Sequence, residues 1–537
     1  MDLQSSFVDD LLHAEDEYEV MALCYNKLLE YTQDSDVLFV AKIEHLEKDR
    51  EFEPFAQEFE NLRQILISYS QEINVHFNLD GTGFDIFKNR LIDELSSFQC
   101  PEQIDISRWF PVCLFYVLDA LDGYISKNIG LVRDKYRTFG PLNQGRSKTN
   151  CLVYFHEQES FLSVSYAEKD GHGEFRRPLR ETRIGNLFHA VLLIPREQIP
   201  IVPRIAPVFL NDYCKESLSE SKKLKIVSIP YIGFDTFSFS FHDACTTDLC
   251  TFGQHPKGLF HIDYGEQAED DVQRIISLLQ FAINRNANII VFPEYIMSPK
   301  MLKGIEDHLK RLDSAQKPSL FLVLAGTCYH WANEKGNNIL HILNANGIEI
   351  GSYYKHSPFL EQSEEKIHGA LLQSKSEPRT KRSYFEVCEI LSEPGKECTL
   401  IDVDIIGRIL PAICRDVISG HTESLSNLFM PSFLIVPAWS RSVSSFDPRF
   451  SILADTIHTI SLLCNCCNAV EGTSKKATGT IVVPRKQGTA MAAFCQKIIR
   501  KRNCTLSCLN HGGCIEQIEI SFVESNPQVS LNKFKLK

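Results

Sequence analysis

The sequence lacks the segments that would place the chain in or across a membrane. Its longest apolar stretch, Phe110 to Leu121, is too short to span a bilayer and contains Asp119. The start, Met1 to Val20, is acidic and has no basic segment followed by an apolar core, so we expect no secretory signal. We therefore predict a cytoplasmic protein with no membrane partner.

An excess of positive charge is also missing. The chain has 56 Lys and Arg against 69 Asp and Glu, a net charge of −13. This balance argues against a protein coated in nucleic acid or anionic lipid. Basic stretches do occur at 133–148, 176–183 and 497–502, so nucleic acid stays open as a partner, although a solvated surface is the simpler interpretation. The sequence has no internal repeat and no low-complexity tract, which excludes solenoids and repetitive linkers.

The length and the cysteines limit the class of protein further. A chain of 537 residues is too long for one ordinary core, so we expect at least two domains. The 18 cysteines are spread over the whole chain, unlike those of a small disulfide scaffold, and we expect most to be free thiols packed as small apolar residues. The segment 200–223, with Pro203, Pro207 and a charged run, is the predicted boundary between domains 1–220 and 221–537.

The two predicted domains differ in their patterns. The first reads as helices over 5–70, 84–98 and 109–128, with strands in 151–166 and 187–194, and it resembles no family that we recognise. It is predicted to be a mainly helical α+β domain of unknown role. The second alternates strands and helices. Its predicted helices are 268–284, 299–312 and 448–464, and its predicted strands are 224–232, 288–292, 320–326, 339–343, 348–354, 399–403, 406–413 and 433–436. Apolar faces on both kinds of element predict two sheets packed face to face with helices outside.

Three segments of the second domain each consist of an apolar, strand-like run followed by a Glu, a Lys or a Cys. They are Ile289-Ile290-Val291-Phe292-Pro293-Glu294-Tyr295, Gly351-Ser352-Tyr353-Tyr354-Lys355-His356 and Leu410-Pro411-Ala412-Ile413-Cys414-Arg415-Asp416. Strand ends are where open α/β sheets gather their functional groups. A carboxylate, an amine and a thiol together suffice for acyl transfer through a covalent thioester.

These segments resemble the nitrilase, or carbon–nitrogen hydrolase, superfamily over about residues 222–523. The family has a Glu after a strand in a PE pattern, a Lys in G-x-Y-x-K and a Cys in C-x-D, and here the three follow in that order about sixty residues apart. The resemblance implies an α/β fold of the nitrilase-like four-layer αββα type. Two inserts, about 235–264 and 373–398, depart from the family, so the resemblance does not identify a substrate.

The resemblance also implies a catalytic triad of Glu294, Lys355 and Cys414. Cys414 would be the nucleophile, and Lys355 would lower its pKa and then bind the oxyanion together with the backbone N–H of Arg415. Glu294 would accept the thiol proton and return it to the leaving amine. Taken singly, each residue has a simpler interpretation, as a buried cysteine or as a partner in a buried ion pair.

Further residues are weaker candidates. The family often has a second Glu after the Lys, and we choose Glu361 over Glu364 and Glu365, the alternative being a solvated charged loop. We expect Asp416 to orient the nucleophile turn. Trp439 and His356 are candidates for the substrate pocket, although core packing for the first and a surface role for the second explain them equally well.

A possible metal site lies near the end of the chain. Four residues have the spacing of zinc ligands: Cys504, Cys508, His511 and Cys514. The segment reads as a hairpin, however, and strand alternation would direct these side chains to different faces. We therefore predict no metal and no cofactor.

We predict a hydrolase that cleaves a non-peptide C–N bond, most simply a linear amide. Nitrile hydrolysis and the use of glutamine as an ammonia source stay open. The alternative is a non-catalytic binding or regulatory module, because nitrilase-like domains also occur beside nucleic-acid enzymes in bacterial defence systems. The family commonly forms homo-oligomers through outer helices, so the helix 419–429, with Leu425, Leu428 and Phe429, is the predicted contact.

Overall fold

The computed structural model describes most of the chain after residue 202 and parts of the chain before it. The described residues are 3–14, 16–32, 150–155, 168–169, 175–176, 191–199, 202–230, 238–243, 258–264, 269–332, 335–357, 360–361, 384–386, 398–440, 442–467, 477–487, 490–499, 514–523 and 526–535, and single residues or short stretches within 88–125. The basic stretch 133–148 and the candidate zinc ligands at 504, 508 and 511 therefore lie outside them, as does the side chain of Cys514.

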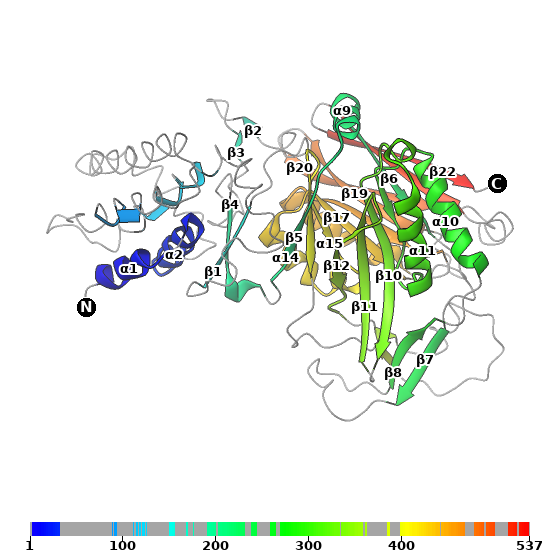
Figure 1. The fold of residues 1–537 in the computed structure, drawn as a ribbon, viewed down its shortest axis with the longest axis horizontal. Helices are drawn as coiled ribbons and strands as arrows, with labels where there is room; N and C mark the ends of the chain where they lie inside the picture. The colour runs from blue at the N-terminus through cyan, green and yellow to red at the C-terminus, as the bar shows by residue number, and fades with distance from the viewer. Residues whose placement is uncertain are drawn as a thin grey trace. The chain divides into compact units, whose positions relative to one another are not determined.

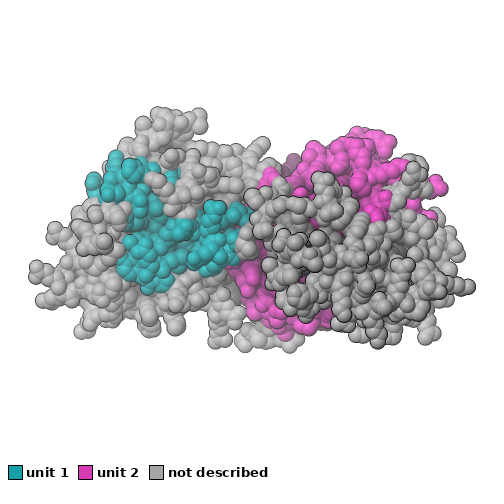
Figure 2. All heavy atoms as spheres, turned by 90° about the horizontal axis from the view of Figure 1, so that it is seen from below, with its two compact units in different colours: residues 1–158, 167–202 teal, residues 159–166, 203–537 magenta. Residues whose placement is uncertain are grey.

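The chain divides into two compact units (Figure 2). The first unit comprises residues 1–158 and 167–202, and the second comprises 159–166 and 203–537. This division lies ahead of residue 220 because β5 (Arg204–Val208) pairs with β15 (Thr399–Val403) inside the second unit, and α9 (Asp212–Ser221) follows it. Prolines at 203 and 207 are typical of a linker. They are tolerated here because β5 is an edge strand, where a missing N–H breaks no ladder.

The described part of the first unit contains both helices and strands, as predicted. Its elements are α1 (Leu3–Leu12), α2 (Glu17–Leu29), β1 (Cys151–Phe155), β2 (Glu168–Lys169), β3 (Phe175–Arg176), β4 (Val191–Pro195) and the 3₁₀ helix η4 (Arg196–Gln198). Asp16 caps α2 by accepting the N–H of Glu19 at 2.9 Å. Lys88 donates to the carbonyls of Leu12 and Ala14 at 3.0 Å each, where α1 ends and its carbonyls need partners. β1 and β4 pair in an antiparallel arrangement.

Two seven-stranded sheets form the second unit (Figure 1). The first sheet runs in the order β12 (Glu349–Tyr354), β11 (Lys335–Asn344), β10 (Leu322–Ala332), β9 (Ile289–Val291), β6 (Lys223–Ser228), β21 (Cys514–Val523) and β22 (Asn526–Lys535). The second sheet runs in the order β20 (Ala490–Ile499), β19 (Ala477–Gln487), β18 (Ile460–Asn465), β17 (Phe433–Ala438), β16 (Gly407–Pro411), β15 and β5. Both sheets have parallel strands at the centre, β6, β9 and β10 in one and β16, β17 and β18 in the other.

Side-chain contacts join the two sheets face to face. The hydroxyl of Ser228 lies 2.9 Å from the thiol of Cys464, which also contacts the carbonyl of Val291 at 3.5 Å. Thr478 donates to the Glu516 carboxylate at 2.7 Å. Each of these contacts links a strand of one sheet to a strand of the other, so the sheets form the two inner layers of the unit.

Helices cover the outer faces. On the first sheet, α10 (Glu269–Ile283) and α11 (Pro299–Arg311) bury their apolar sides with Val227, Ile290 and Val323 in one core cluster. On the second sheet, α15 (Asp447–Thr456) packs on β18, β19 and β20, and α14 (His421–Phe429) packs beside α15. The short helix α13 (Arg415–Ile418) precedes α14, and η6 (Ser314–Gln316) and η7 (Val443–Ser445) are 3₁₀ turns. This arrangement confirms the predicted four-layer αββα sandwich.

Local structure also differs from the sequence prediction at the end of one helix and in the two inserts. The predicted helix 448–464 ends at Thr456, and β18 begins at Ile460, because this apolar run pairs with β17 on one side and β19 on the other. The predicted inserts also contain strands. β7 (Ser238–Asp243), β8 (Gly258–Asp263), β13 (Leu360–Glu361) and β14 (Tyr384–Glu386) form a separate four-stranded sheet. No helix within the described ranges is long and apolar enough to cross a membrane.

Candidate active site

Glu294 stands in a tight turn at the carboxyl end of β9. The next residue, Tyr295, has a positive φ of 67°, and its N–H donates to the Thr327 hydroxyl at 2.8 Å. Gly326 lies against this turn, so close that a Cβ there would be 2.7 Å from the carbonyl oxygen of Pro293. A bulge in β10 between Leu324 and Thr327 produces this approach. The turn is thus held from the neighbouring strand, which fixes the direction of the Glu294 side chain.

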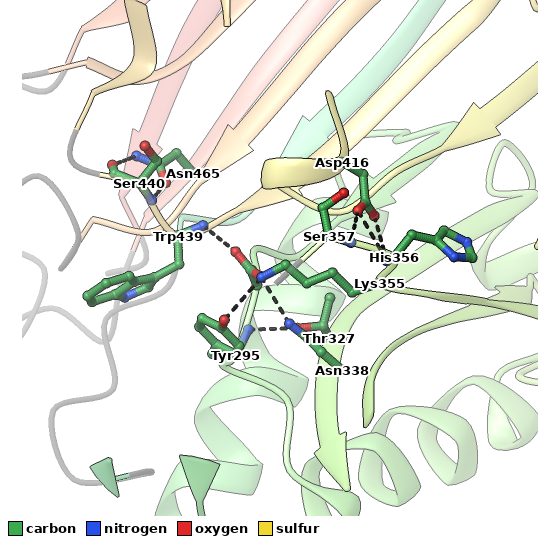
Figure 3. A network of polar contacts seen from close by, with 11 residues as sticks. Tyr295, Thr327, Asn338, Lys355, His356, Ser357, Asp416, Trp439, Ser440 and Asn465 are labelled. Carbon is green, nitrogen blue, oxygen red and sulfur yellow. Dashed lines mark hydrogen bonds and ion pairs between the residues drawn. The ribbon is translucent and has the colours of Figure 1, made fainter. Parts of the chain in front are cut away.

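Both oxygens of the Glu294 carboxylate accept hydrogen bonds (Figure 3). Oε1 accepts from the Lys355 ammonium at 2.7 Å and from the Asn338 amide at 3.0 Å. Oε2 accepts from the backbone N–H of Trp439 at 2.9 Å. The residue is 1% exposed, and a carboxylate this deeply buried is stable only when it is paired and hydrogen-bonded. The donors come from both sheets, so the carboxylate lies where the sheets meet.

Lys355 follows β12 and reaches the same carboxylate from an edge strand. Its N–H donates to the carbonyl of Asn338 at 2.9 Å, which extends the β11–β12 pairing past the strand end. Its ammonium also donates to the Tyr295 hydroxyl at 3.2 Å, 5.3 Å from the centre of that ring. The Lys355 side chain has no exposed surface, so its charge acts in a medium of low polarity.

Cys414 occupies a strained turn between β16 and α13. Its backbone angles, φ 40° and ψ −99°, are a conformation that residues other than glycine rarely adopt. Its N–H donates to the carbonyl of Pro437 at 3.0 Å. The thiol is 3% exposed and lies close enough to the Glu294 carboxylate and the Lys355 ammonium for both to shift its pKa. The structure thus brings Glu294, Lys355 and Cys414 together, at the carboxyl ends of strands from both sheets.

The charges around Cys414 act in opposite directions. Burial raises the pKa of the thiol well above its usual value, and the neighbouring Glu294 carboxylate raises it further. Lys355 and the N–H of Trp439 lower this pKa, but by less. Burial and the Glu294 carboxylate thus outweigh the lysine, whereas the sequence led us to expect Lys355 to lower the pKa of this thiol. A proton acceptor must take part, and Glu294 is placed to be one.

Asp416 connects the cysteine turn to the lysine turn. Its carboxylate accepts the N–H of Ser357 at 2.6 Å and that of His356 at 3.1 Å (Figure 3). Burial raises the pKa of Asp416 to about 7, although Lys355 and the two N–H groups act against the rise. The residue therefore holds the segment after Lys355 beside the Cys414 turn, a wider positioning role than orientation of the cysteine turn.

His356 and Trp439, the two pocket candidates, lie in different surroundings. The Trp439 ring contacts the Tyr295 ring edge-on at a centroid distance of 6.4 Å, next to the carboxylate that its own N–H contacts. The His356 ring points away from Glu294 (Figure 3) and lies 4.2 Å from the His421 ring. A cavity of about 580 Å³ opens there, lined by His356, Ser357, Ser419, Gly420, His421, Glu423, Ser424 and Asn427.

For Arg415 and for the glutamates that follow Lys355, the structure describes fewer contacts. Arg415 is the first residue of α13, so its N–H belongs to the first helical turn, whose amides have no partners within the helix. The backbone of Glu361 lies in β13 of the four-stranded sheet, paired with Tyr384, and its side chain is outside the described part of the chain. Glu364 and Glu365 are also outside it.

Two site residues have contacts that the sequence did not reveal. Tyr295 donates its N–H to Thr327 and receives a hydrogen bond from Lys355, and Asn338 holds Glu294 Oε1. Tyr264, the last residue of the first insert, donates to the Tyr295 carbonyl at 3.2 Å and accepts the N–H of Tyr329 at 3.0 Å. Tyr295 lies within the first motif, so its position was the available signal, whereas Asn338 lies between the motifs on β11 and nothing in the three motifs marked it.

Comparison with known proteins gives matches only among solved structures. No protein-family model matches the chain, and neither does any curated protein. Saccharomyces cerevisiae Nit3, a member of branch 10 of the nitrilase superfamily, matches at 13% identity over 52% of this chain and 90% of that chain, with a TM-score of 0.30.

Two further structures show the range of the matches. An amidase from Nesterenkonia sp. matches at 11% identity over 53% of this chain and 95% of that chain, with a TM-score of 0.29. The glutamine-dependent NAD+ synthetase from Acinetobacter baumannii matches at 12% identity, with a TM-score of 0.33, over 59% of this chain and 49% of that chain. The roles of individual residues come from the contacts around Glu294 and not from these likenesses.

Proposed function

We propose that the second unit is a carbon–nitrogen hydrolase that cleaves a non-peptide amide through a thioester on Cys414. The observation that carries the proposal is the buried ion pair of Glu294 and Lys355, which lies close enough to the Cys414 thiol for both charges to shift its pKa. In this arrangement Glu294 accepts a proton, the Cys414 sulfur attacks the carbonyl carbon, and Lys355 supplies a positive charge. These are the requirements of acyl transfer through a covalent intermediate.

The first half of the reaction forms the thioester. Glu294 takes the thiol proton while the sulfur of Cys414 attacks the carbonyl carbon of the amide. The carbonyl oxygen becomes an oxyanion, which Lys355 and the N–H of Arg415 stabilise. Glu294 then returns the proton to the nitrogen, the C–N bond breaks, and ammonia or an amine leaves. Because burial and Glu294 raise the pKa of the thiol, proton transfer accompanies the attack.

The second half restores the enzyme. Glu294 removes a proton from water, and the resulting hydroxide attacks the thioester carbon. The C–S bond of the tetrahedral intermediate breaks, the acid is released, and the proton on Glu294 returns to the Cys414 sulfur. The cycle consumes one water for each C–N bond and uses only groups of the protein. Asp416 keeps the lysine and cysteine turns together throughout, since it contacts the segments that follow both.

The experiment is a turnover assay with matched cysteine variants. Purified full-length protein is incubated with linear amides, nitriles and glutamine in separate arms, and the release of ammonia or amine is measured. Cys414→Ser should remove turnover, because the hydroxyl has a much higher pKa than a thiol. Cys464→Ser, a change at another buried cysteine of the second sheet, should keep it. Turnover that survives Cys414→Ser would overturn the proposal and favour a binding or regulatory module.

We also propose that the chain forms a homo-oligomer, but through other residues than the three that the sequence led us to expect. Leu425, Leu428 and Phe429 of α14 are already buried within this chain, at 2%, 5% and 1% exposure, so they are not free to contact a second copy. We propose that any homo-oligomer uses the outer side of α14 instead, where Ser424 and Asn427 are exposed. Sedimentation at micromolar concentration that shows only monomers would remove this part of the proposal without affecting the chemistry.

A further inference from the structure

Three potential metal ligands lie together on the hairpin formed by β10 and β11 (Figure 1). Cys328 is paired with Ile339, and His330 with Asn337, so these four side chains share one face of the antiparallel pair. His341 is two residues beyond Ile339 on β11 and therefore falls on the same face. The ligand atoms of Cys328, His330 and His341 all lie within 4.8 Å of one another.

His341 is held in the orientation of a metal-binding histidine. Its Nδ1 lies 3.0 Å from the Glu349 carboxylate, and because a carboxylate only accepts, Nδ1 carries the hydrogen. In the neutral ring, Nε2 then has its lone pair available. This atom is buried and has no hydrogen-bond partner among the described residues, in a residue that is 9% exposed. A carboxylate behind a histidine is the arrangement that fixes a ligating imidazole.

We infer that Cys328, His330 and His341 bind a divalent transition-metal ion of the zinc class. A thiolate with two imidazoles suits Zn²⁺ and excludes Mg²⁺ and Ca²⁺, which require oxygen ligands. In a tetrahedral zinc site these atoms would be roughly 3.3–3.6 Å apart, given the usual Zn–S and Zn–N lengths. Small side-chain rotations close the remaining gap, since His330 is exposed and free to adjust. Water would take the fourth position.

The balance of charge and protons is consistent with this assignment. Burial raises the pKa of the Cys328 thiol to about 12 and lowers that of His330 below its usual value. Binding of Zn²⁺ displaces one proton, from the thiol. The ion–ligand set then carries one positive charge, which the nearby Glu349 offsets. The exposed His330 gives the ion a path from solvent.

This site is separate from the proposed active site. On β11, Asn338 contacts Glu294 from one face, while strand alternation places His341 on the other. None of the three ligands contacts Glu294, Lys355 or Cys414 through a hydrogen bond. Metal binding can therefore be measured without any assumption about catalysis, and a failure of one proposal leaves the other standing.

The test is zinc binding by the full chain after removal of metal with a chelator. Competition against a chromophoric chelator should show one tight equivalent of Zn²⁺. Cobalt in its place should show the thiolate-to-metal absorption of a sulfur-ligated ion. Cys328→Ser should remove that absorption, and His341→Ala should weaken zinc binding at least about a hundredfold. Glu349→Gln, a mild change at a partly exposed position, should weaken it about 10–100-fold by freeing the His341 ring.

Matched controls identify which cysteines are responsible. Cys214→Ser alters another buried thiol and should leave zinc binding unchanged. Cys504→Ala with Cys508→Ala removes the cysteine pair of the other candidate set and should also leave the tight equivalent in place. The inference is wrong if the chain binds no zinc, if Cys328→Ser and Glu349→Gln retain wild-type affinity, or if only the Cys504 and Cys508 changes remove the ion.

Discussion

Two buried ion pairs of the second unit contrast in how they are assembled. Arg408 and Asp402 face each other on the neighbouring strands β16 and β15, with two parallel hydrogen bonds of 2.7 and 2.8 Å. Lys355 and Glu294 also meet at 2.7 Å, but they come from different strands of the first sheet. Their further partners, the N–H of Trp439 and the thiol of Cys414, come from the second sheet.

The contrast shows that a buried ion pair alone does not indicate a functional site. The Arg408–Asp402 pair is bidentate and joins two neighbouring strands, and the Asp402 side chain is 18% exposed. A role in stabilising the sheet is enough to explain this pair. The lysine pair is enclosed at 0% and 1% exposure, and its carboxylate lies close enough to a thiol on a strained turn to raise the pKa of that thiol. Convergence of a nucleophile with the pair, and not the pair itself, distinguishes the candidate active site.

The largest expected effect comes from the two groups that exchange the proton. Glu294→Gln should lower kcat by about 10²–10⁴-fold, because it removes the base without changing the volume. Cys414→Ser should lower turnover to background. The double variant should be hardly slower than the worse single variant, since the two groups act as a unit. Independent, multiplying losses in steady-state kinetics would contradict this account.

The second prediction compares the two cations directly. Lys355→Met leaves the Glu294 carboxylate buried without a counter-charge, at a cost of about 3–5 kcal/mol in the free energy of unfolding. Arg408→Met should cost less, because Asp402 is partly exposed to water. Turnover per folded molecule should fall at least about a hundredfold for Lys355→Met and stay near wild type for Arg408→Met. Urea unfolding and kinetics on the same samples measure both quantities, and equal losses of turnover would remove the distinction.

The third prediction concerns the turn that carries Glu294. Gly326→Ala adds a Cβ 2.7 Å from the Pro293 carbonyl oxygen at a φ of +75°, so it should cost about 2–4 kcal/mol of stability. Gly420→Ala is the matched control, because its φ is +89° but no atom lies within 4 Å of the new Cβ. It should cost only about 1–2 kcal/mol. Stability is measured by thermal or urea unfolding. A larger loss of stability for Gly420→Ala than for Gly326→Ala would show that the contact with the Pro293 carbonyl is unimportant.

The last prediction is a pH dependence of stability at Asp416. Burial raises its pKa from 3.8 to about 7, so the stability gained from the bound proton is full below about pH 4 and is lost as the pH rises through about 7. Asp416→Asn keeps an acceptor oxygen but cannot ionise. The wild type should therefore lose about 3–4 kcal/mol relative to the variant between about pH 4 and pH 8. Urea unfolding across this pH range measures the free energy of unfolding of both proteins. The same pH dependence in the wild type and in Asp416→Asn would contradict the prediction.

Much of the second unit was predictable from sequence because its central strands are short apolar runs that end in polar residues. Glu294, Lys355 and Cys414 follow such runs, and the ends of strands in packed sheets meet at one edge. β18 was read as the end of a helix, because a buried apolar run does not reveal its own period. β5 was missed because proline is typical of linkers and also acceptable at a sheet edge.

Contacts across strands and between sheets were not predictable in the same way. The hydrogen bond from Asn338 to Glu294 and the meeting of Cys328 with His341 depend on the bulge in β10, which sets the β10–β11 register. A one-residue change in that register would send these side chains to the opposite face. The pKa of the Cys414 thiol likewise depends on burial, which sequence does not give, so the lysine's influence was overestimated.

The central claim is a covalent bond between Cys414 and the acyl group of an amide. Its most direct measurement is mass spectrometry of the full chain, quenched in acid during turnover of an amide found in the assay, followed by peptide mapping. The account predicts a mass increase equal to the acyl group, carried by the peptide containing Cys414 and absent in Cys414→Ser. An acyl group on another cysteine such as Cys464, or steady turnover with no adduct under any quench time, would contradict it.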